Sequence, residues 1–276
     1  MTATQHEKAT RFRALHQRDG VFLIPNPWDG GSARVLERLD FEALATSSSA
    51  SAGTLARTDG NLSRDEAIAH CRLIASSTSL PVSGDLENGF ARAPEGVAET
   101  VRLAGAAGLV GCSIEDSTHD RSNPLFDISL ATERIAAAIE AARTFPFPFM
   151  LTARAEVFTV GTGNLDEAIR RLEAYERAGA DVLFAPGLPT LEAIREVCAA
   201  VRKPLNFMVT LRGKSFSVSE LAAAGVKRIS FASSLYRAAM SGLLKAAQEI
   251  QKDGTFKFLD EIPTGKEWSA YFQSLL

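Results

Sequence analysis

Short apolar runs alternate with helix-like segments along most of this chain, and this alternation limits the possible folds more than any other feature. Helix-like patterns, such as those over residues 63–77 and 165–179, separate the runs, and glycine ends several helices directly before the next run. Repeated strand–helix units of this kind predict a parallel sheet. The expected strands cover residues 21–25, 43–47, 81–87, 109–116, 149–154, 181–187, 204–209 and 226–232.

Two architectures contain such repeated units. Eight strands with intervening helices suit a closed (β/α)8 barrel, and a chain of 276 residues suits one domain of this kind. An open doubly wound sheet is the alternative, but no G-x-G-x-x-G motif follows the first strand, so its dinucleotide-binding form lacks support. We therefore predict an α/β TIM barrel in a single domain over residues 1–276. Residues 234–276 form a tail that is longer than one closing helix requires.

The composition argues against several classes of protein. The formal net charge is -3 and the chain has no basic block, so a nucleic-acid partner is not expected. No apolar run approaches the roughly 20 residues that cross a bilayer. The polar N-terminal segment argues against a secretory signal, so we expect a cytoplasmic location. Three scattered cysteines, Cys71, Cys112 and Cys198, match neither a disulfide framework nor a zinc pattern.

Charged side chains gather where the expected strands end, which is the end of a barrel that carries active sites. Asp85 and Glu87 close the third strand, Glu115 closes the fourth and Arg154 closes the fifth. Asp59 lies in the long loop after the second strand. Because residues i and i+2 of a strand point to the same face, Asp85 and Glu87 are expected to point into the barrel together. The sequence therefore predicts a polar cup.

Several carboxylates in one cup repel each other, and they stay ionised only if a cation is bound. Oxygen ligands without paired histidine or cysteine favour Mg²⁺, or Mn²⁺, over zinc. We therefore predict a metal site at Asp85, Glu87 and Glu115, with Arg154 facing an anionic substrate. The alternative is that these acids are solvated loop charges or helix caps. Residues 46–53, rich in small hydroxyl side chains, fit either an anion cradle or a flexible polar loop.

Several motifs, in order along the chain, resemble those of the isocitrate lyase/phosphoenolpyruvate mutase superfamily. They read GDLENGF, GAAGLVGCSIED, LTAR, EAYERAGADVLFAPGL and PLNFM. The resemblance implies a (β/α)8 barrel whose last helix is exchanged with a partner subunit in a homodimer or homotetramer. Residues 234–276 would then lie in the subunit interface. It also implies Mg²⁺ and a 2-oxo acid or enolpyruvate-type ligand.

The resemblance also implies roles for individual residues around the metal. Asp85 matches the direct metal ligand, and Glu87 stands where many members have aspartate. Glu115 matches an acid that supports the metal indirectly. Asp59 matches the acid that faces the reacting group. Arg154 matches the arginine that holds the carboxylate or oxo group of the substrate.

Three further positions match the part of the pocket that binds the substrate. Ser47 and Ser48 fall where the family holds the anionic end of the substrate through hydroxyl and amide groups. Asn206 falls at the seventh-strand position that lines the pocket.

The loop over residues 117–127 bears on the chemistry. Lyases of the superfamily carry a Lys-Lys-Cys-Gly-His loop, but this loop contains no cysteine. It matches the phosphonate branch in part, with Arg121 at the second lysine of that motif and Asn123 in register. His119, in the same loop, is a further candidate.

We expect a Mg²⁺-dependent lyase or phosphonomutase-like enzyme that cleaves or forms a C–C or P–C bond at C3 of a small 2-oxo acid or phosphonate. The reaction would pass through a pyruvate enolate. An oxaloacetate decarboxylase-like activity needs no acid from the loop and is one alternative. A non-catalytic 2-oxo acid-binding protein and a metal-dependent aldolase on another barrel are the others.

Overall fold

Eight parallel strands lie side by side in the computed structural model of the protein, which describes residues 3–160, 163–210, 213 and 216–273. The sheet order is β1-β8-β7-β6-β5-β4-β3-β2, and the backbone N–H of Ala45 in β2 donates to the carbonyl of Pro25 after β1 at 3.0 Å. The sheet is therefore a nearly closed barrel, and the predicted α/β TIM barrel is confirmed. The strands are β1 Phe22–Ile24, β2 Leu44–Ala45, β3 Val82–Asp85, β4 Gly111–Glu115, β5 Met150–Arg154, β6 Val182–Phe184, β7 Leu205–Met208 and β8 Arg228–Ser230.

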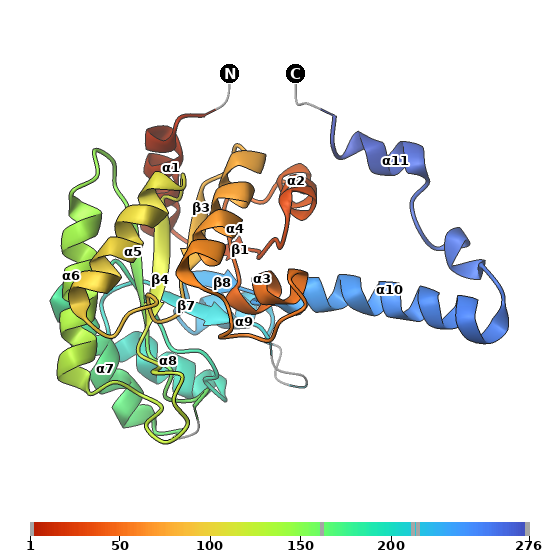
Figure 1. Ribbon diagram of the computed structural model, residues 1–276. Helices are drawn as coiled ribbons and strands as arrows, with labels where there is room; N and C mark the ends of the chain where they lie inside the picture. Colours follow the sequence, from red (N-terminus) through yellow and green to blue (C-terminus); the bar gives the residue numbers. More distant parts are fainter. Residues whose placement is uncertain (1–2, 161–162, 211–212, 214–215, 274–276) are drawn as a thin grey trace.

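Helices follow the strands and surround the barrel (Figure 1). Helix α1 precedes β1, and its buried face packs against side chains near the amino-terminal ends of the strands, including Phe22, Val110 and Met150. The helices around the barrel are α1 Gln5–Gln17, α2 Gly30–Arg38, α3 Ser48–Thr54, α4 Arg64–Ser77, α5 Pro94–Ala106, α6 Ile128–Arg143, α7 Leu165–Ala178, α8 Leu191–Ala200 and α9 Val218–Ala223.

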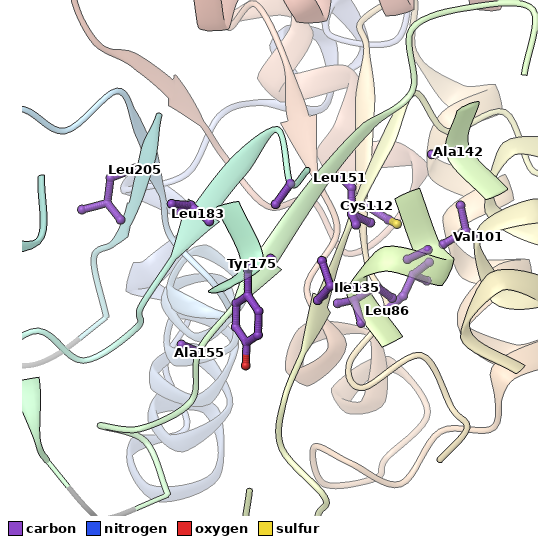
Figure 2. Packing of buried hydrophobic residues seen from close by; sticks show 14 of the residues in the cluster. Leu86, Val101, Cys112, Ile135, Ala142, Leu151, Ala155, Tyr175, Leu183 and Leu205 are labelled. Atoms are coloured by element: carbon purple, nitrogen blue, oxygen red, sulfur yellow. The ribbon is translucent and has the colours of Figure 1, made fainter. Parts of the chain in front are cut away.

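The main hydrophobic core fills the layer between the sheet and these helices. Figure 2 shows Cys112 of β4 and Leu151 of β5 beside side chains of the surrounding helices, such as Ile135 and Tyr175. Cys112 therefore faces the helices, as its place in the strand pattern predicts. Its neighbour Ser113 lines the interior of the barrel.

The chain after β8 leaves the barrel as an arm (Figure 1). The arm consists of α10 Ser234–Asp253, the 3-10 helix η1 Lys257–Asp260 and α11 Gly265–Ala270. None of these elements contains a buried residue. Large apolar side chains along it are exposed, among them Leu243 and Phe256 at 60% each. No helix in the described ranges of the chain is long and apolar enough to span a membrane.

Candidate active site

A cavity of about 890 Å³ opens at the carboxyl-terminal ends of the strands. It is lined by the candidate residues Ser47, Ser48, Asp59, Asp85, Glu87, Glu115, Arg121, Arg154 and Asn206. Asn123 lies apart from them, on a neighbouring cavity of about 830 Å³. The barrel therefore brings together candidate residues from four of its strands, from the start of α3 and from three loops, except for Asn123.

Asp85 is held in place at the end of β3. Its Oδ2 accepts a hydrogen bond from the backbone N–H of Ser48 at 3.0 Å, and its Oδ1 accepts one from the Ser113 hydroxyl at 3.3 Å. The Asp85 backbone N–H donates to Thr46 Oγ1 at 2.8 Å. The Ser47 hydroxyl accepts the Ala50 N–H and so caps α3. These bonds fix the Asp85 carboxylate toward the cavity.

Glu87 reaches the same cavity by a different route from the one expected. Strand β3 ends at Asp85, and Glu87 has a φ of 47°, in the left-handed region, so the expected strand over 81–87 is wrong beyond Asp85. The chain turns here, since the Gly89 N–H donates to the Leu86 carbonyl at 2.8 Å. The Glu115 N–H still donates to the Glu87 carbonyl at 2.9 Å, which ties this turn to β4.

One oxygen of Glu87 has no partner among the described residues. Its Oε1 is buried and accepts no hydrogen bond, while Oε2 lies 3.6 Å from His119 Nδ1. Burial, together with the nearby Asp85 carboxylate, raises the pKa of Glu87 to about 8. A buried carboxylate oxygen without a donor is a position that a cation or a proton would satisfy.

Arg154 stands among the carboxylates. Its Nη1 lies 3.3 Å from Glu115 Oε2 and 3.6 Å from Asp85 Oδ1, and its Nε pairs with Glu156. Burial alone would lower the pKa of Arg154, but Glu156, Glu115 and Asp85 raise it above its ordinary value. Burial likewise acts to raise the pKa of Glu115, but Arg154 and His119 outweigh it and lower that pKa. For Glu156, burial prevails over Arg154 and raises the pKa to about 8.

The loop after β4 lies over this group of acids. His119 Nε2 is 3.1 Å from Glu115 Oε1, and this bond raises the pKa of His119. Backbone bonds from Thr118 to Pro124 and from Phe126 to Asp116, both 2.9 Å, hold the loop in a tight turn. Arg121, which is exposed, also lines the cavity from this loop.

A buried network supports the ends of β4 and β5 from behind. Asp116 accepts hydrogen bonds from the Tyr175 hydroxyl at 2.6 Å, from Arg171 Nη1 at 2.9 Å and from the Glu156 backbone N–H at 2.8 Å. The network links α7 to the two strands whose ends carry Glu115 and Arg154.

Two charged residues of the cavity lining were not predicted. Glu156 follows Arg154 by two residues, which is the spacing that signals a shared face in a strand. Arg228 is the first residue of β8, within the expected strand 226–232, and it lines the cavity as a buried charged residue. Both signals are visible in the sequence.

The fit of these residues to a metal rests on Asp85 and Glu87. In the ranges that the structure describes, no three side chains of His, Cys, Asp or Glu form a ready-made metal site. Mg²⁺, however, commonly takes only one or two carboxylates and keeps several waters. The ordered Asp85 carboxylate and the unpartnered Glu87 oxygen fit that mode of binding.

Comparison with known proteins identifies chains that are similar to this one over most of its length. Residues 12–251 match the family model described as phosphoenolpyruvate phosphomutase. A 2-methylisocitrate lyase from Aeropyrum pernix is 30% identical over 93% of this chain and 84% of the relative. Among solved structures, a Burkholderia cenocepacia J2315 protein, named only in general terms as a lyase/mutase, is 48% identical over 98% of each chain, with a TM-score of 0.96.

A more distant structure is informative because its chemistry is named. It is a 2,3-dimethylmalate lyase of the PEP mutase/isocitrate lyase superfamily, 27% identical over 99% of this chain and 95% of the other, with a TM-score of 0.86. The resemblance read from the motifs is thus confirmed.

Proposed function

Because the chain belongs to the phosphoenolpyruvate phosphomutase family, we propose that it is a Mg²⁺-dependent lyase or mutase acting on a small 2-oxo acid or phosphonate. It would cleave or form a C–C or P–C bond at C3 of that substrate, through a pyruvate enolate. The observation that carries this proposal is the convergence of Asp85, Glu87, Glu115 and Arg154 on one cavity.

Superfamily lyases are generally dependent on a divalent metal, and Asp85 with Glu87 would hold Mg²⁺, or Mn²⁺, in this chain. Glu115 would support it through water, since its carboxylate is already engaged by His119 and Arg154. When bound, the metal supplies positive charge that stabilises an enolate.

The side chains of this protein then have separate tasks. Arg154 binds the carboxylate or oxo group of the substrate through its planar guanidinium. Ser47 and Ser48 position the anionic end of the substrate, and Asn206 lines the pocket from β7. Asp59, exposed at the mouth of the cavity, faces the reacting group.

The loop over residues 117–127 decides which bond is broken. It contains no cysteine to act as acid or base, so we infer that the enzyme does not cleave isocitrate or 2-methylisocitrate at a useful rate. Arg121, with Asn123 nearby in the loop, closes over the C3 substituent and excludes water. Decarboxylation of oxaloacetate is the second candidate, because loss of CO₂ requires no acid from this loop.

The C-terminal arm supports a proposal about assembly. The described part of the arm, residues 234–273, exposes a series of apolar side chains, and α10 contains no buried residue. We infer that the arm packs against a second copy, with the last barrel helix exchanged between subunits of a homodimer or homotetramer. We also infer a cytoplasmic enzyme.

A substrate panel tests the proposed function. Release of pyruvate from oxaloacetate, phosphonopyruvate and 2-methylisocitrate would be measured with and without Mg²⁺, in the wild type and in Asp85→Ala. We expect Mg²⁺-dependent turnover of at least one of the first two, lost in the variant. Mg²⁺-dependent binding of oxalate without any turnover would indicate the non-catalytic alternative. The absence of both binding and turnover would refute the proposal.

A further inference from the structure

The floor of the cavity contains a buried arginine that the proposed reaction does not use. Arg228, at the start of β8, lines the cavity beside Asn206 and Ser230 and is only 5% exposed. Among the described residues, no carboxylate pairs with its guanidinium, and burial alone accounts for the lowering of its pKa to about 9. The group therefore remains a cation at neutral pH, without a counter-ion.

Neutral groups provide the partners of Arg228. Its Nε donates to Asn206 Oδ1 at 2.8 Å and its Nη2 to Thr152 Oγ1 at 3.0 Å. Its Nη1 lies 3.4 Å from His16 Nε2. His16 Nδ1 lies 2.8 Å from the Phe12 carbonyl, which can only accept, so Nε2 is the acceptor toward Arg228. A guanidinium has five N–H donors, so each terminal nitrogen keeps one N–H beyond these three bonds.

The acids at the rim do not neutralise this cation. Asp85 and Glu115 interact with Arg154, and Glu156 pairs with the same guanidinium. A buried charge without a partner is costly, and a carboxylate or phosphonate is the partner that a guanidinium binds best. The cavity, at about 890 Å³, is also larger than a three-carbon 2-oxo acid requires.

We propose that Arg228 and Asn206 bind a second anionic group of the substrate at the floor of the cavity. The substrate is then a 2-oxo acid that carries an additional carboxylate or phosphonate, with its metal-chelating end at the rim; this last point rests on the proposed function. Asn206 Nδ2 donates to Ser230 Oγ at 3.0 Å and has one N–H left for the anion.

Binding measurements with matched ligands test this proposal. Dissociation constants would be measured by calorimetry at saturating Mg²⁺ for 2-oxoglutarate, 2-oxo-4-phosphonobutanoate and 5-methyl-2-oxohexanoate. The last is a neutral-ended isostere of 2-oxoglutarate. We expect the wild type to bind at least one dianion at least tenfold more tightly than the isostere, and the better dianion identifies carboxylate or phosphonate. Arg228→Met should remove this preference and leave the affinity for oxalate unchanged.

Arg121→Met tests the competing assignment, because Arg121 of the loop is another cavity cation that could recognise the second anionic group. If Arg121→Met removes the preference and Arg228→Met does not, the floor assignment is overturned. It is also overturned if the wild type shows no preference, or if Arg228→Met weakens oxalate and the dianions equally. If Arg228→Met does not fold, a wild type without the preference still overturns the assignment, and Arg121→Met still tests the loop as the source of any preference. Failure of oxalate to bind would count against the metal-chelating rim of the proposed function, whereas the wild-type preference for a dianion over the isostere still tests the floor.

Discussion

The histidine buried under the barrel should make the stability of this protein depend on pH. His16 of α1 is 6% exposed and lies edge-on to the rings of Phe12 and Phe22, at 4.7 and 4.8 Å between centroids. Burial, and then the positive charge of Arg228, lower the pKa of His16 to about 3. Protonation would place a second buried cation against the guanidinium.

The sign and size of the effect follow from linkage. In the unfolded chain a histidine has a pKa near 6.5, so below that pH the unfolded state binds a proton that the folded state does not accept until about pH 3. The contribution of His16 to stability is therefore complete above about pH 6.5 and is lost as the pH falls. At pH 5 the pH lies about 1.5 units below the pKa of the unfolded-state histidine. At about 1.4 kcal/mol per unit, His16 then lowers the free energy of unfolding by about 2 kcal/mol relative to neutral pH.

Urea denaturation at pH 7.5 and at pH 5.0 measures this loss. His16→Gln cannot ionise but keeps a donor and an acceptor, so its pH-dependent loss of unfolding free energy should be about 2 kcal/mol smaller than that of the wild type. The free energies of unfolding at the two pH values are compared within each protein, so a packing cost of the substitution that does not depend on pH cancels. His6→Gln, at the exposed start of the same helix, controls for the removal of a surface histidine. Equal losses in the wild type and in His16→Gln would refute the reasoning.

Four other outcomes are expected from the site and its support. Asp85→Ala should abolish high-affinity Mg²⁺ binding in calorimetry, and unchanged affinity would contradict the metal assignment. Oxalate should bind only with metal present, and Arg154→Lys should weaken it by more than the 0–1 kcal/mol or so of an exposed ion pair, because a bidentate contact is lost. Arg121→Ala should lower kcat on the true substrate without changing Mg²⁺ affinity; unchanged kinetics would mean that this arginine is only a solvated charge. Tyr175→Phe should lower the free energy of unfolding by about 1–3 kcal/mol, since Asp116 loses a buried O–H donor, and a loss below about 0.3 kcal/mol would argue against this network.

The sequence pattern was sufficient to predict the barrel because its strands are specified locally. Each expected run contains one observed strand. For example, the expected run 149–154 contains β5, Met150–Arg154. Alternation also predicted which way Cys112 faces, because strand side chains alternate between the helices and the barrel interior. The ends of the runs were less well predicted, since turns rather than hydrophobicity end a strand.

The strand pattern by itself predicted the position of those site residues that stand at the ends of strands. Asp85 and Arg154 are of this kind, and both line the cavity. Glu87 was predicted to line it for the wrong reason, because its left-handed backbone and not a strand directs it there. The pairing of Arg228 with His16 joins residues 212 positions apart, and no local pattern encodes it.

The arrangement of charge with depth explains why metal and substrate should bind together. Carboxylates concentrate at the rim around one arginine, whereas the floor holds a cation without an acid. An anionic ligand that enters alone meets the rim carboxylates, which repel it. A divalent cation at Asp85 reverses the sign of the potential there and leaves Arg154 able to turn from its acids to the ligand. Oxalate is small enough to sit entirely at the rim and gains nothing from Arg228, so it isolates the rim. A longer dianion must place one anionic group at the rim and the other beside Arg228 at the floor. Its affinity therefore measures how the rim and the floor act together.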